Sequence, residues 1–151
     1  MKKWVWIVSI AVLALLGYIA ASVLAGIDQK RTAEERAEGI AKNEGGLESV
    51  DDFYLYHGTE SYSVIIGPDK KGTDYVLFIP DNLKKEKVIK MKYSSGYSES
   101  EIIGRVKREH NPYQIVSVKL GMKKRVPIWE ITVKDEEGNL KYIAYNFKKQ
   151  G

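Results

Sequence analysis

The sequence has 151 residues, a formal net charge of +4 and no cysteine. The absence of thiols excludes disulfide bridges, cysteine-based zinc sites and thiol catalysis, and the mild, mixed charge is not that of a nucleic-acid-binding protein. About 120 residues follow an apolar N-terminal stretch, enough for one ordinary domain or two small ones.

The N-terminal stretch Trp4–Ile27 contains no charged residue. A helix needs roughly 20 apolar residues to cross the hydrocarbon core of a bilayer, and this stretch is long enough. Lysines precede it and charged residues end it sharply. We therefore predict a cytoplasmic tail over residues 1–3 and a transmembrane anchor over residues 4–27. A short basic tail, an apolar core and then a polar domain favour placing the rest of the chain outside the cytoplasm.

Cleavage of the same stretch as a secretory signal is the alternative. Val23-Leu24-Ala25 has small residues where a signal peptidase cuts, and cleavage would leave a mature N-terminus at Gly26. The apolar run is longer than a typical signal core, which favours the uncleaved anchor. Leu24-Ala25-Gly26 also looks like a lipoprotein cleavage box, but Ile27 stands where that box requires cysteine.

The next segment predicts a short helix followed by strands. Thr32-Ala33-Glu34-Glu35 has the pattern of a capping box, so a helix is expected from Thr32 to Gly45-Gly46. Alternatively, these residues continue the membrane helix as a stalk. Alternating residues then predict four strands, the middle two forming a hairpin and the lysine-rich fourth lying near a sheet edge. They are expected at Val50–His57, Tyr62–Ile66, Tyr75–Ile79 and Lys87–Tyr93.

The C-terminal half repeats this order. Ser98-Glu99-Ser100-Glu101 is a second capping box, and the helix it begins should stop before Asn111-Pro112. Three more strands are expected, with a basic turn at Gly121–Arg125 and an acidic hairpin turn at Asp135–Asn139. The strands are Tyr113–Leu120, Val126–Lys134 and Leu140–Phe147. The sequence thus predicts an α+β fold with two modules, residues 28–93 and 94–151, that pack together because each is marginal alone.

Candidate catalytic and metal-binding groups are sparse. His57 lies on a predicted strand and His110 at a predicted helix end, so structural or surface roles are favoured over a metal site. A nucleophile elbow of the form Gly-x-Ser-x-Gly does not occur, and the acidic pairs Asp51-Asp52 and Glu136-Glu137 fall at strand ends or turns. We therefore expect no enzymatic activity, no cofactor, no metal ion and no small-molecule substrate.

Two surfaces could bind a macromolecule. Lys87, Lys90 and Lys92 are predicted to form a solvated face, and the alternative is attraction to anionic lipid headgroups or wall polymers. Ten tyrosines are present, and tyrosine is enriched at binding surfaces. Tyr54 and Tyr56 on the first predicted strand are the candidate partner-binding residues, while the face carrying Trp129 is expected in the core.

The two predicted modules resemble known families. Trp129–Val133, the acidic turn ending at Gly138 and Tyr142–Phe147 resemble the final hairpin of a PepSY domain. The first module resembles the TseB-like (YpmB) family of Firmicutes, a likeness that extends over essentially the whole chain, anchor included. The residues that carry it are Tyr62–Gly67, Asp69–Thr73 and Tyr75–Phe78.

The TseB-like resemblance implies one N-terminal membrane anchor and two tandem cystatin-like modules on the extracytoplasmic side. It also implies a non-catalytic regulator of cell-wall elongation that contacts a penicillin-binding protein. The PepSY resemblance leaves inhibition of an extracellular protease as an alternative, beside binding of anionic wall polymer or lipid. One departure is the stretch Asn146–Gly151, where the family usually has an Asp-containing turn ending in Thr-Gly.

Overall fold

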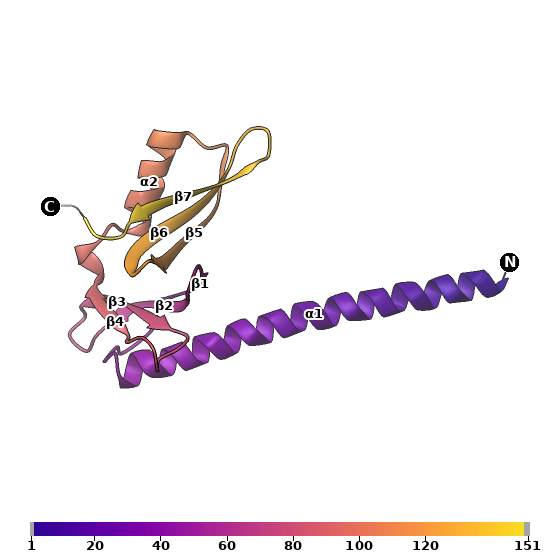
Figure 1. Cartoon of the computed structure of the whole chain (residues 1–151), viewed down its shortest axis with the longest axis horizontal. Helices are drawn as coiled ribbons and strands as arrows, with labels where there is room; N and C mark the ends of the chain where they lie inside the picture. The colour runs from indigo at the N-terminus through magenta and orange to yellow at the C-terminus, as the bar shows by residue number, and fades with distance from the viewer. Residues whose placement is uncertain (1, 150–151) are drawn as a thin grey trace. The chain divides into compact units, whose positions relative to one another are not determined.

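The structure is a computed structural model that describes residues 2–149 and has an α+β architecture. Met1, Gln150 and Gly151, which belong to the predicted tail and the end of the second predicted module, lie outside the described residues. Two compact units are present, one up to Glu35 and one from Arg36 onward. The elements are α1 (Lys2–Asn43), β1 (Asp52–His57), β2 (Ser61–Pro68), β3 (Asp74–Pro80), β4 (Ile89–Lys92), the 3-10 helix η1 (Tyr93–Ser95), α2 (Glu99–His110), β5 (Gln114–Lys123), β6 (Val126–Lys134) and β7 (Leu140–Asn146) (Figure 1).

Helix α1 is continuous through the predicted anchor and beyond it. Its apolar part reaches a mean hydropathy of 2.5 over 18 residues, none of which is buried. By length and composition this helix suits a membrane anchor or a signal sequence.

The predicted helix start at Thr32 is wrong, and the alternative of a continued helix is confirmed. Thr32 Oγ1 donates a hydrogen bond to the carbonyl of Asp28 at 2.9 Å, as a threonine inside a helix does. Arg31 forms ion pairs with Asp28 at 3.2 Å and with Glu35 at 3.6 Å. Such pairs one turn apart support the helix across the position where a new start was expected.

Strands β1 to β4 form one antiparallel sheet in sequence order. The predicted hairpin is confirmed as β2 and β3, whose turn is held by Asp69: its Oδ1 accepts the backbone N–H groups of Lys71 and Thr73 at 2.9 and 3.0 Å. The short strand β4 lies at the edge, as its lysines indicated. One face of this sheet packs on the last turns of α1. The buried residues there are Ala37, Ala41, Leu47, Ile65, Leu77 and Ile79.

Strands β5, β6 and β7 form a second antiparallel sheet in that order. Strand β5 continues past Leu120 to Lys123, so the predicted five-residue basic turn is wrong. The actual turn is Lys124-Arg125, whose φ angles of 49° and 64° are both positive. Two-residue hairpin turns with two positive φ angles match the natural twist of the strands they join.

The two sheets and α2 share one hydrophobic core. Each strand turns alternate residues toward it, and the predicted burial of the Trp129 face is confirmed. The core unites residues from both predicted modules, whose division at residues 93 and 94 stays a prediction. Its buried members are Tyr62, Val64, Ile66, Val76, Phe78, Ile102, Val106, Leu120, Met122, Trp129, Ile131, Val133 and Phe147.

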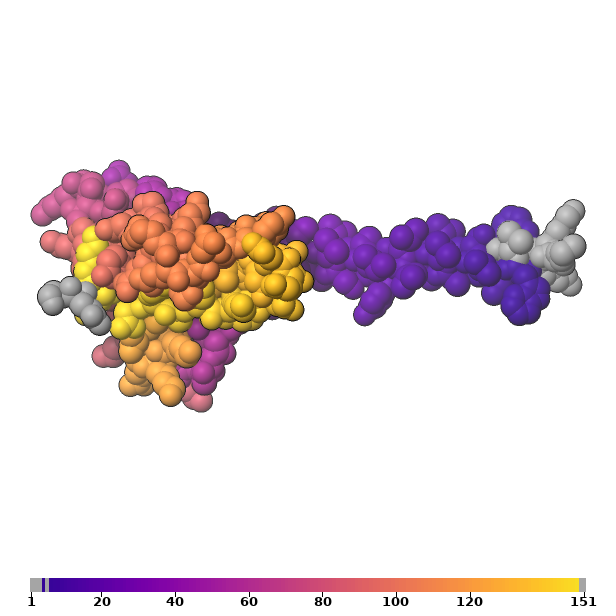
Figure 2. Space-filling view, turned by 90° about the horizontal axis from the view of Figure 1, so that it is seen from above, coloured from indigo at the N-terminus to yellow at the C-terminus, as the bar shows by residue number. Residues whose placement is uncertain are grey.

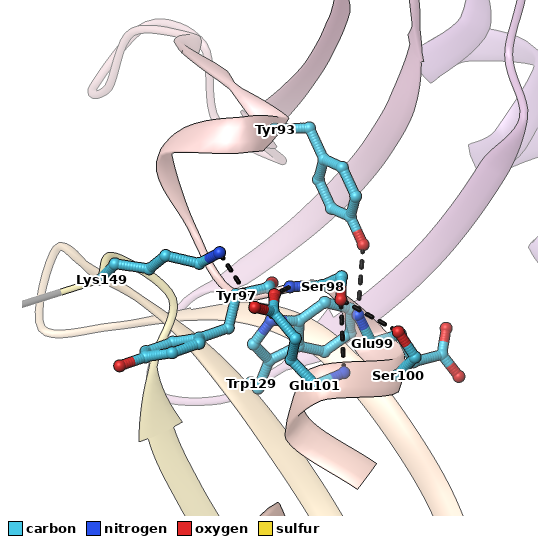
Figure 3. Close-up of polar contacts among 8 residues, drawn as sticks. All are labelled: Tyr93, Tyr97, Ser98, Glu99, Ser100, Glu101, Trp129 and Lys149. Carbon is cyan, nitrogen blue, oxygen red and sulfur yellow. Dashed lines mark hydrogen bonds and ion pairs between the residues drawn. The ribbon is translucent and has the colours of Figure 1, made fainter. Parts of the chain in front are cut away.

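Helix α2 begins with the predicted capping box (Figure 3). Ser98 Oγ accepts the N–H of Glu101 at 3.2 Å, and Glu101 Oε2 accepts the N–H of Ser98 at 2.7 Å. The Tyr93 hydroxyl accepts a third helix N–H, that of Glu99, at 3.3 Å. Three of the backbone donors left open at a helix start are therefore satisfied.

The same region joins α2 to the second sheet (Figure 3). The indole N–H of Trp129 donates to the carbonyl of Tyr97 at 2.8 Å, which satisfies the one polar group of a fully buried side chain. Lys149 Nζ pairs with Glu101 Oε1 at 3.0 Å. The C-terminal segment after β7 is thus fastened to the start of α2.

A close contact between the sheets requires glycine at position 121. Tyr56 on β1 packs against β5 at this point, and a Cβ built on Gly121 would lie 2.2 Å from Cδ2 of the Tyr56 ring. No side chain larger than hydrogen fits unless β1 moves. The contact explains how a bulky tyrosine reaches the face of the second sheet.

Gly121→Ala should therefore destabilise the protein. Overpacking of this kind typically costs about 1–3 kcal/mol. The control is Gly104→Ala in α2, where the new methyl group would lie 3.4 Å from the flexible end of Arg108 and alanine gains roughly 0.5–1 kcal/mol over glycine in a helix. Chemical denaturation measures both free energies of unfolding. A Gly121→Ala variant as stable as the parent would contradict the tight packing.

Candidate functional site

The two tyrosines predicted to bind a partner are largely taken up by contacts within the second unit. Tyr54 is half-buried; its ring meets Trp129 edge-on with 6.2 Å between centroids, and its hydroxyl donates to Glu99 at 3.2 Å. Burial, and then the Glu99 carboxylate, raise the pKa of Tyr54. Tyr56 is only 4% exposed, and burial and its hydrogen-bonded neighbour Glu130 raise its pKa as well. A partner contact through these two residues stays a prediction.

The predicted lysine face is not uniform. Lys90 Nζ donates to the carbonyl of Gly45 at 2.6 Å and lies 4.0 Å from the centroid of the Tyr75 ring. Carbonyls just after a helix, like this one after α1, attract cations. The ammonium groups of Lys87 and Lys92 are exposed and make no hydrogen bond or ion pair with residues 2–149. Binding of a polyanion by the three lysines stays a prediction.

The two histidines have separate partners. His57 Nδ1 is 3.1 Å from Ser61 Oγ, and His110 Nε2 is 3.1 Å from the hydroxyl of Tyr145. Across residues 2–149, no three carboxylate or imidazole side chains come together in a way that could hold a metal ion. Each histidine thus contacts one hydroxyl group, and a structural or surface role for the two stays a prediction.

Four exposed apolar or aromatic side chains of the second unit lie at one end of the β5–β7 sheet. Tyr113, Val116, Leu140 and Tyr142 are 72%, 49%, 53% and 71% exposed, and we call these four residues the distal patch. Val116 stands out because β5 has a bulge between Ile115 and Ser117. The pairing rows Ser117–Thr132–Tyr142 and Gln114–Lys134–Leu140 place the four residues at the end of the sheet where the β6–β7 turn lies, with Leu140 and Tyr142 on one face of it.

A hollow of about 610 Å³ adjoins the distal patch. Tyr113 and Tyr142 line it, together with His110 at the end of α2, Ile143 of β7 and the acidic residues 135–137 of the β6–β7 turn. Figure 2 shows the gold and yellow atoms of this part of the chain at the surface beside the orange atoms of α2. Aromatic walls with a charged rim suit recognition of a protein segment.

A polar network fixes α2 beside this surface. The hydroxyl of Tyr145 on β7 donates to Glu109 Oε2 at 2.5 Å, and Arg105 pairs with Glu109 at 2.8 Å. The Arg105 guanidinium also lies 4.7 Å from the centroid of the Tyr145 ring. Burial and the Glu109 carboxylate raise the pKa of Tyr145 to about 12, and the hydrogen bonds from Tyr145 and Arg105 lower the pKa of Glu109.

Comparison with known proteins identifies the family. The family described as "Cell wall elongation regulator TseB-like domain" matches residues 36–80. The "Probable cell wall elongation regulator TseB" of Bacillus subtilis strain 168 is 33% identical over 145 residues, which cover 95% of this chain and 88% of the relative. This chain belongs to the TseB-like family. That membership supports a regulatory role in cell wall elongation.

A solved structure agrees with the TseB-like assignment. The YpmB protein from Bacillus subtilis superposes with a TM-score of 0.68 and 32% identity, covering 76% of this chain and 89% of its own. The segment matched by the TseB-like family, residues 36–80, contains the end of α1 and strands β1 to β3. The distal patch lies outside that segment, in the second sheet.

Sequence reasoning missed the distal patch. It favoured Tyr54 and Tyr56 because they alternate on a strand, yet alternation alone does not tell whether a strand has one buried face or two. A local signal was available: Tyr113 follows the break Asn111-Pro112, and Tyr142 follows the acidic turn. Connecting segments run over the protein surface, so residues beside them are often exposed.

Lys90→Ala should lower the stability of the protein by about 1 kcal/mol, because it removes a charge-assisted hydrogen bond and a cation–π contact. Lys87→Ala and Lys92→Ala are matched controls on the same face and should stay within about 0.5 kcal/mol of the parent. Thermal and urea unfolding measure the difference. Equal effects of all three substitutions would show that the Gly45 contact does not matter.

Stability at alkaline pH should depend on Tyr145. Because its folded-state pKa is raised to about 12, its contribution is fully present below the ordinary tyrosine pKa of about 10 and is lost as the pH rises through 12. The gap in unfolding free energy between the parent and Tyr145→Phe should therefore shrink over that range. Tyr142→Phe, at an exposed position, is the control. A gap that stays constant from pH 8 to 12 would contradict the assignment.

Proposed function

We propose that this chain is a non-catalytic regulator of cell wall elongation that works from the outer face of the membrane by binding a penicillin-binding protein. The observation that carries the proposal is the 33% identity, over 95% of the chain, to a relative named as a cell wall elongation regulator. The penicillin-binding protein is the partner implied by the TseB-like resemblance. A regulator of a membrane-bound enzyme needs a recognition surface rather than a catalytic centre.

Helix α1 supports a membrane-anchored form of this regulator. An anchored protein and a membrane-bound enzyme share a thin layer of space, which raises their effective concentration for one another. A weak surface contact is then sufficient for regulation. The basic start before the apolar run favours placing the second unit on the extracytoplasmic side.

The distal patch supports the contact itself. Two highly exposed tyrosines, Tyr113 and Tyr142, line a hollow with an acidic rim, and the exposed aliphatic residues Val116 and Leu140 lie at the same end of the sheet. Tyrosine contributes a large contact area with little loss of side-chain entropy, and it often dominates binding energy. The tyrosines whose pKa is strongly raised, by contrast, donate hydrogen bonds to glutamates of the same unit, as Tyr54 and Tyr145 show.

The natural absence of cysteine allows one experiment to test both the topology and the contact. Single-cysteine variants Tyr113→Cys and Tyr142→Cys, with Leu83→Cys as an exposed control outside the patch, are expressed in the host bacterium in place of the parent. A membrane-impermeant maleimide should label all three in intact cells. A thiol-linked photocrosslinker should then trap a penicillin-binding protein from positions 113 and 142 more strongly than from position 83.

Each arm of this experiment can fail separately. Labelling that occurs only after cell lysis would overturn the extracytoplasmic topology. If no wall-synthesis protein is trapped from any of the three positions, and deletion leaves cell length and width unchanged, the regulatory contact is wrong. Trapping from position 83 alone would move the contact away from the distal patch.

A further inference from the structure

Strand β7 is an edge strand without the usual protection. The sheet order is β5-β6-β7, and β7 pairs with β6 over all seven residues without a bulge. No proline interrupts it, and its single lysine, Lys141, is paired with Asp135 at 3.3 Å. The other edges differ: β4 has four residues, two of them lysines, and β5 packs against β1. Since proteins normally protect exposed edges with such features, β7 is suited to pairing with another strand.

Two hydrogen bonds fix which backbone groups of β7 face outward. The N–H of Asp135 donates to the carbonyl of Asn139 at 3.1 Å, and the N–H of Phe147 donates to the carbonyl of Pro127 at 2.9 Å. Antiparallel ladders alternate between bonded and non-bonded pairs, so residues 141, 143 and 145 face β6. No residue between 2 and 149 bonds to the outward groups. These groups belong to Leu140, Tyr142, Ala144 and Asn146.

We propose that β7 pairs with β7 of a second copy of this chain. Only residues whose backbone N–H and C=O groups face outward can hydrogen-bond across such an interface. The antiparallel register must therefore place outward-facing residues of one copy opposite outward-facing residues of the other. The register that pairs all seven residues is centred on Ile143, which then faces Ile143 of the second copy. Tyr142 and Ala144 exchange backbone hydrogen bonds with Ala144 and Tyr142 of that copy.

The side chains fit this register on both faces of the sheet. At the centre the two Ile143 side chains meet as an apolar pair, and the large Tyr142 stands beside the small Ala144. On the α2 side, Lys141 comes opposite Tyr145, whose hydroxyl is bonded to Glu109. An ammonium group is thus placed next to an aromatic ring and a carboxylate, both of which attract it.

Charge also favours the antiparallel arrangement. The acidic residues Glu136 and Glu137 precede β7, and the basic residue Lys148 follows it, next to Lys149, which is paired with Glu101. Antiparallel pairing brings the acidic end of one strand to the basic end of the other, at both ends of the interface. Glu136 and Glu137 have no cationic partner within residues 2–149, so they are available for this role.

The pairing goes beyond the proposed function and is compatible with it. Two three-stranded sheets would become one six-stranded sheet, with α2 from both copies on the same face. The opposite face would carry Leu140 and Tyr142 of both copies, related by the two-fold axis. A membrane-bound partner would then meet these residues twice, which increases avidity without new contacts.

The test uses the full chain in detergent micelles and in membranes, with Ile143→Cys as the reporter. In the proposed register the two Cα atoms at position 143 lie about 4.5 Å apart, within reach of a disulfide, which spans about 4.4–6.8 Å. Mild oxidation should therefore give a covalent dimer on non-reducing gels. Lys141→Cys is the control on the same strand, because its two copies lie roughly 13 Å out of register.

A second variant tests the backbone bonds. Ala144→Pro removes an outward N–H while leaving the β6 ladder intact, and Ala144→Ser keeps that N–H. The proline variant loses two hydrogen bonds per dimer, which should weaken dimerisation by about tenfold or more. Sedimentation of the micellar protein measures this, and the serine variant should behave as the parent. Thermal unfolding checks that the proline variant is folded. If it is not folded, the relative disulfide crosslinking of Ile143→Cys and Lys141→Cys decides whether β7 pairs with β7.

Several outcomes would overturn the pairing. Equal crosslinking at positions 143 and 141 would indicate random collision or pairing through α1. A monomeric parent with no Ile143→Cys dimer would leave β7 unpaired. Capture of a different protein by Ile143→Cys, in place of a second copy, would assign the edge to that protein.

The proposed function is tested separately from the β7 pairing. If Tyr113→Cys still traps a penicillin-binding protein in the Ala144→Pro background, the proposed function holds whether or not the chain dimerises.

Discussion

The second unit depends on two small sheets that turn alternate residues toward one common core. Neither sheet could bury enough apolar surface alone, because units of this size lose too little of their surface on folding. Trp129 shows how completely the common core excludes solvent. Its ring is fully buried, and its indole N–H is satisfied by the carbonyl of Tyr97 in the segment between the sheets. The connection from β4 to α2 is therefore part of the core rather than a free linker.

The many tyrosines divide into two physical groups. Those inside the fold, such as Tyr54 and Tyr145, direct a hydroxyl to a glutamate and need that acceptor to be buried at low cost. Tyr113 and Tyr142 have no such partner among residues 2–149 and face solvent. The sequence singled out Tyr54 and Tyr56 and did not separate the two groups. The first sheet is covered on both faces, by the second sheet on one side and by the last turns of α1 on the other. Alternation along β1 therefore could not tell whether its tyrosines reach the surface.

The two capping-box sequences show how far local patterns predict structure. Ser98 starts a helix because β4 has already ended at Lys92, and the 3-10 helix η1 with Gly96 separates it from α2. Thr32 has the same pattern three residues ahead of a glutamate, but Gln29, Lys30 and Arg31 before it are good helix formers. An ion pair joins Arg31 to Asp28, and neither glycine nor proline interrupts residues 28–31. A capping-box sequence predicts a helix start correctly only where the preceding helix or strand also ends. The β2–β3 hairpin and the buried Trp129 face followed from periodicity, whereas the distal patch depended on which faces the tertiary packing left open.

The continuity of α1 determines where the chain could be cut without loss of the fold. Ala37 and Ala41 are buried against the first sheet, and Arg36 donates to the carbonyl of Asp81 at 3.1 Å. The last turns of α1 are thus a structural part of the second unit. A protease that released the protein at Gly26 would leave these turns in place and shed a folded regulator. A cut within residues 37–43 would instead uncover Leu77 and Ile79 and expose the first sheet to aggregation.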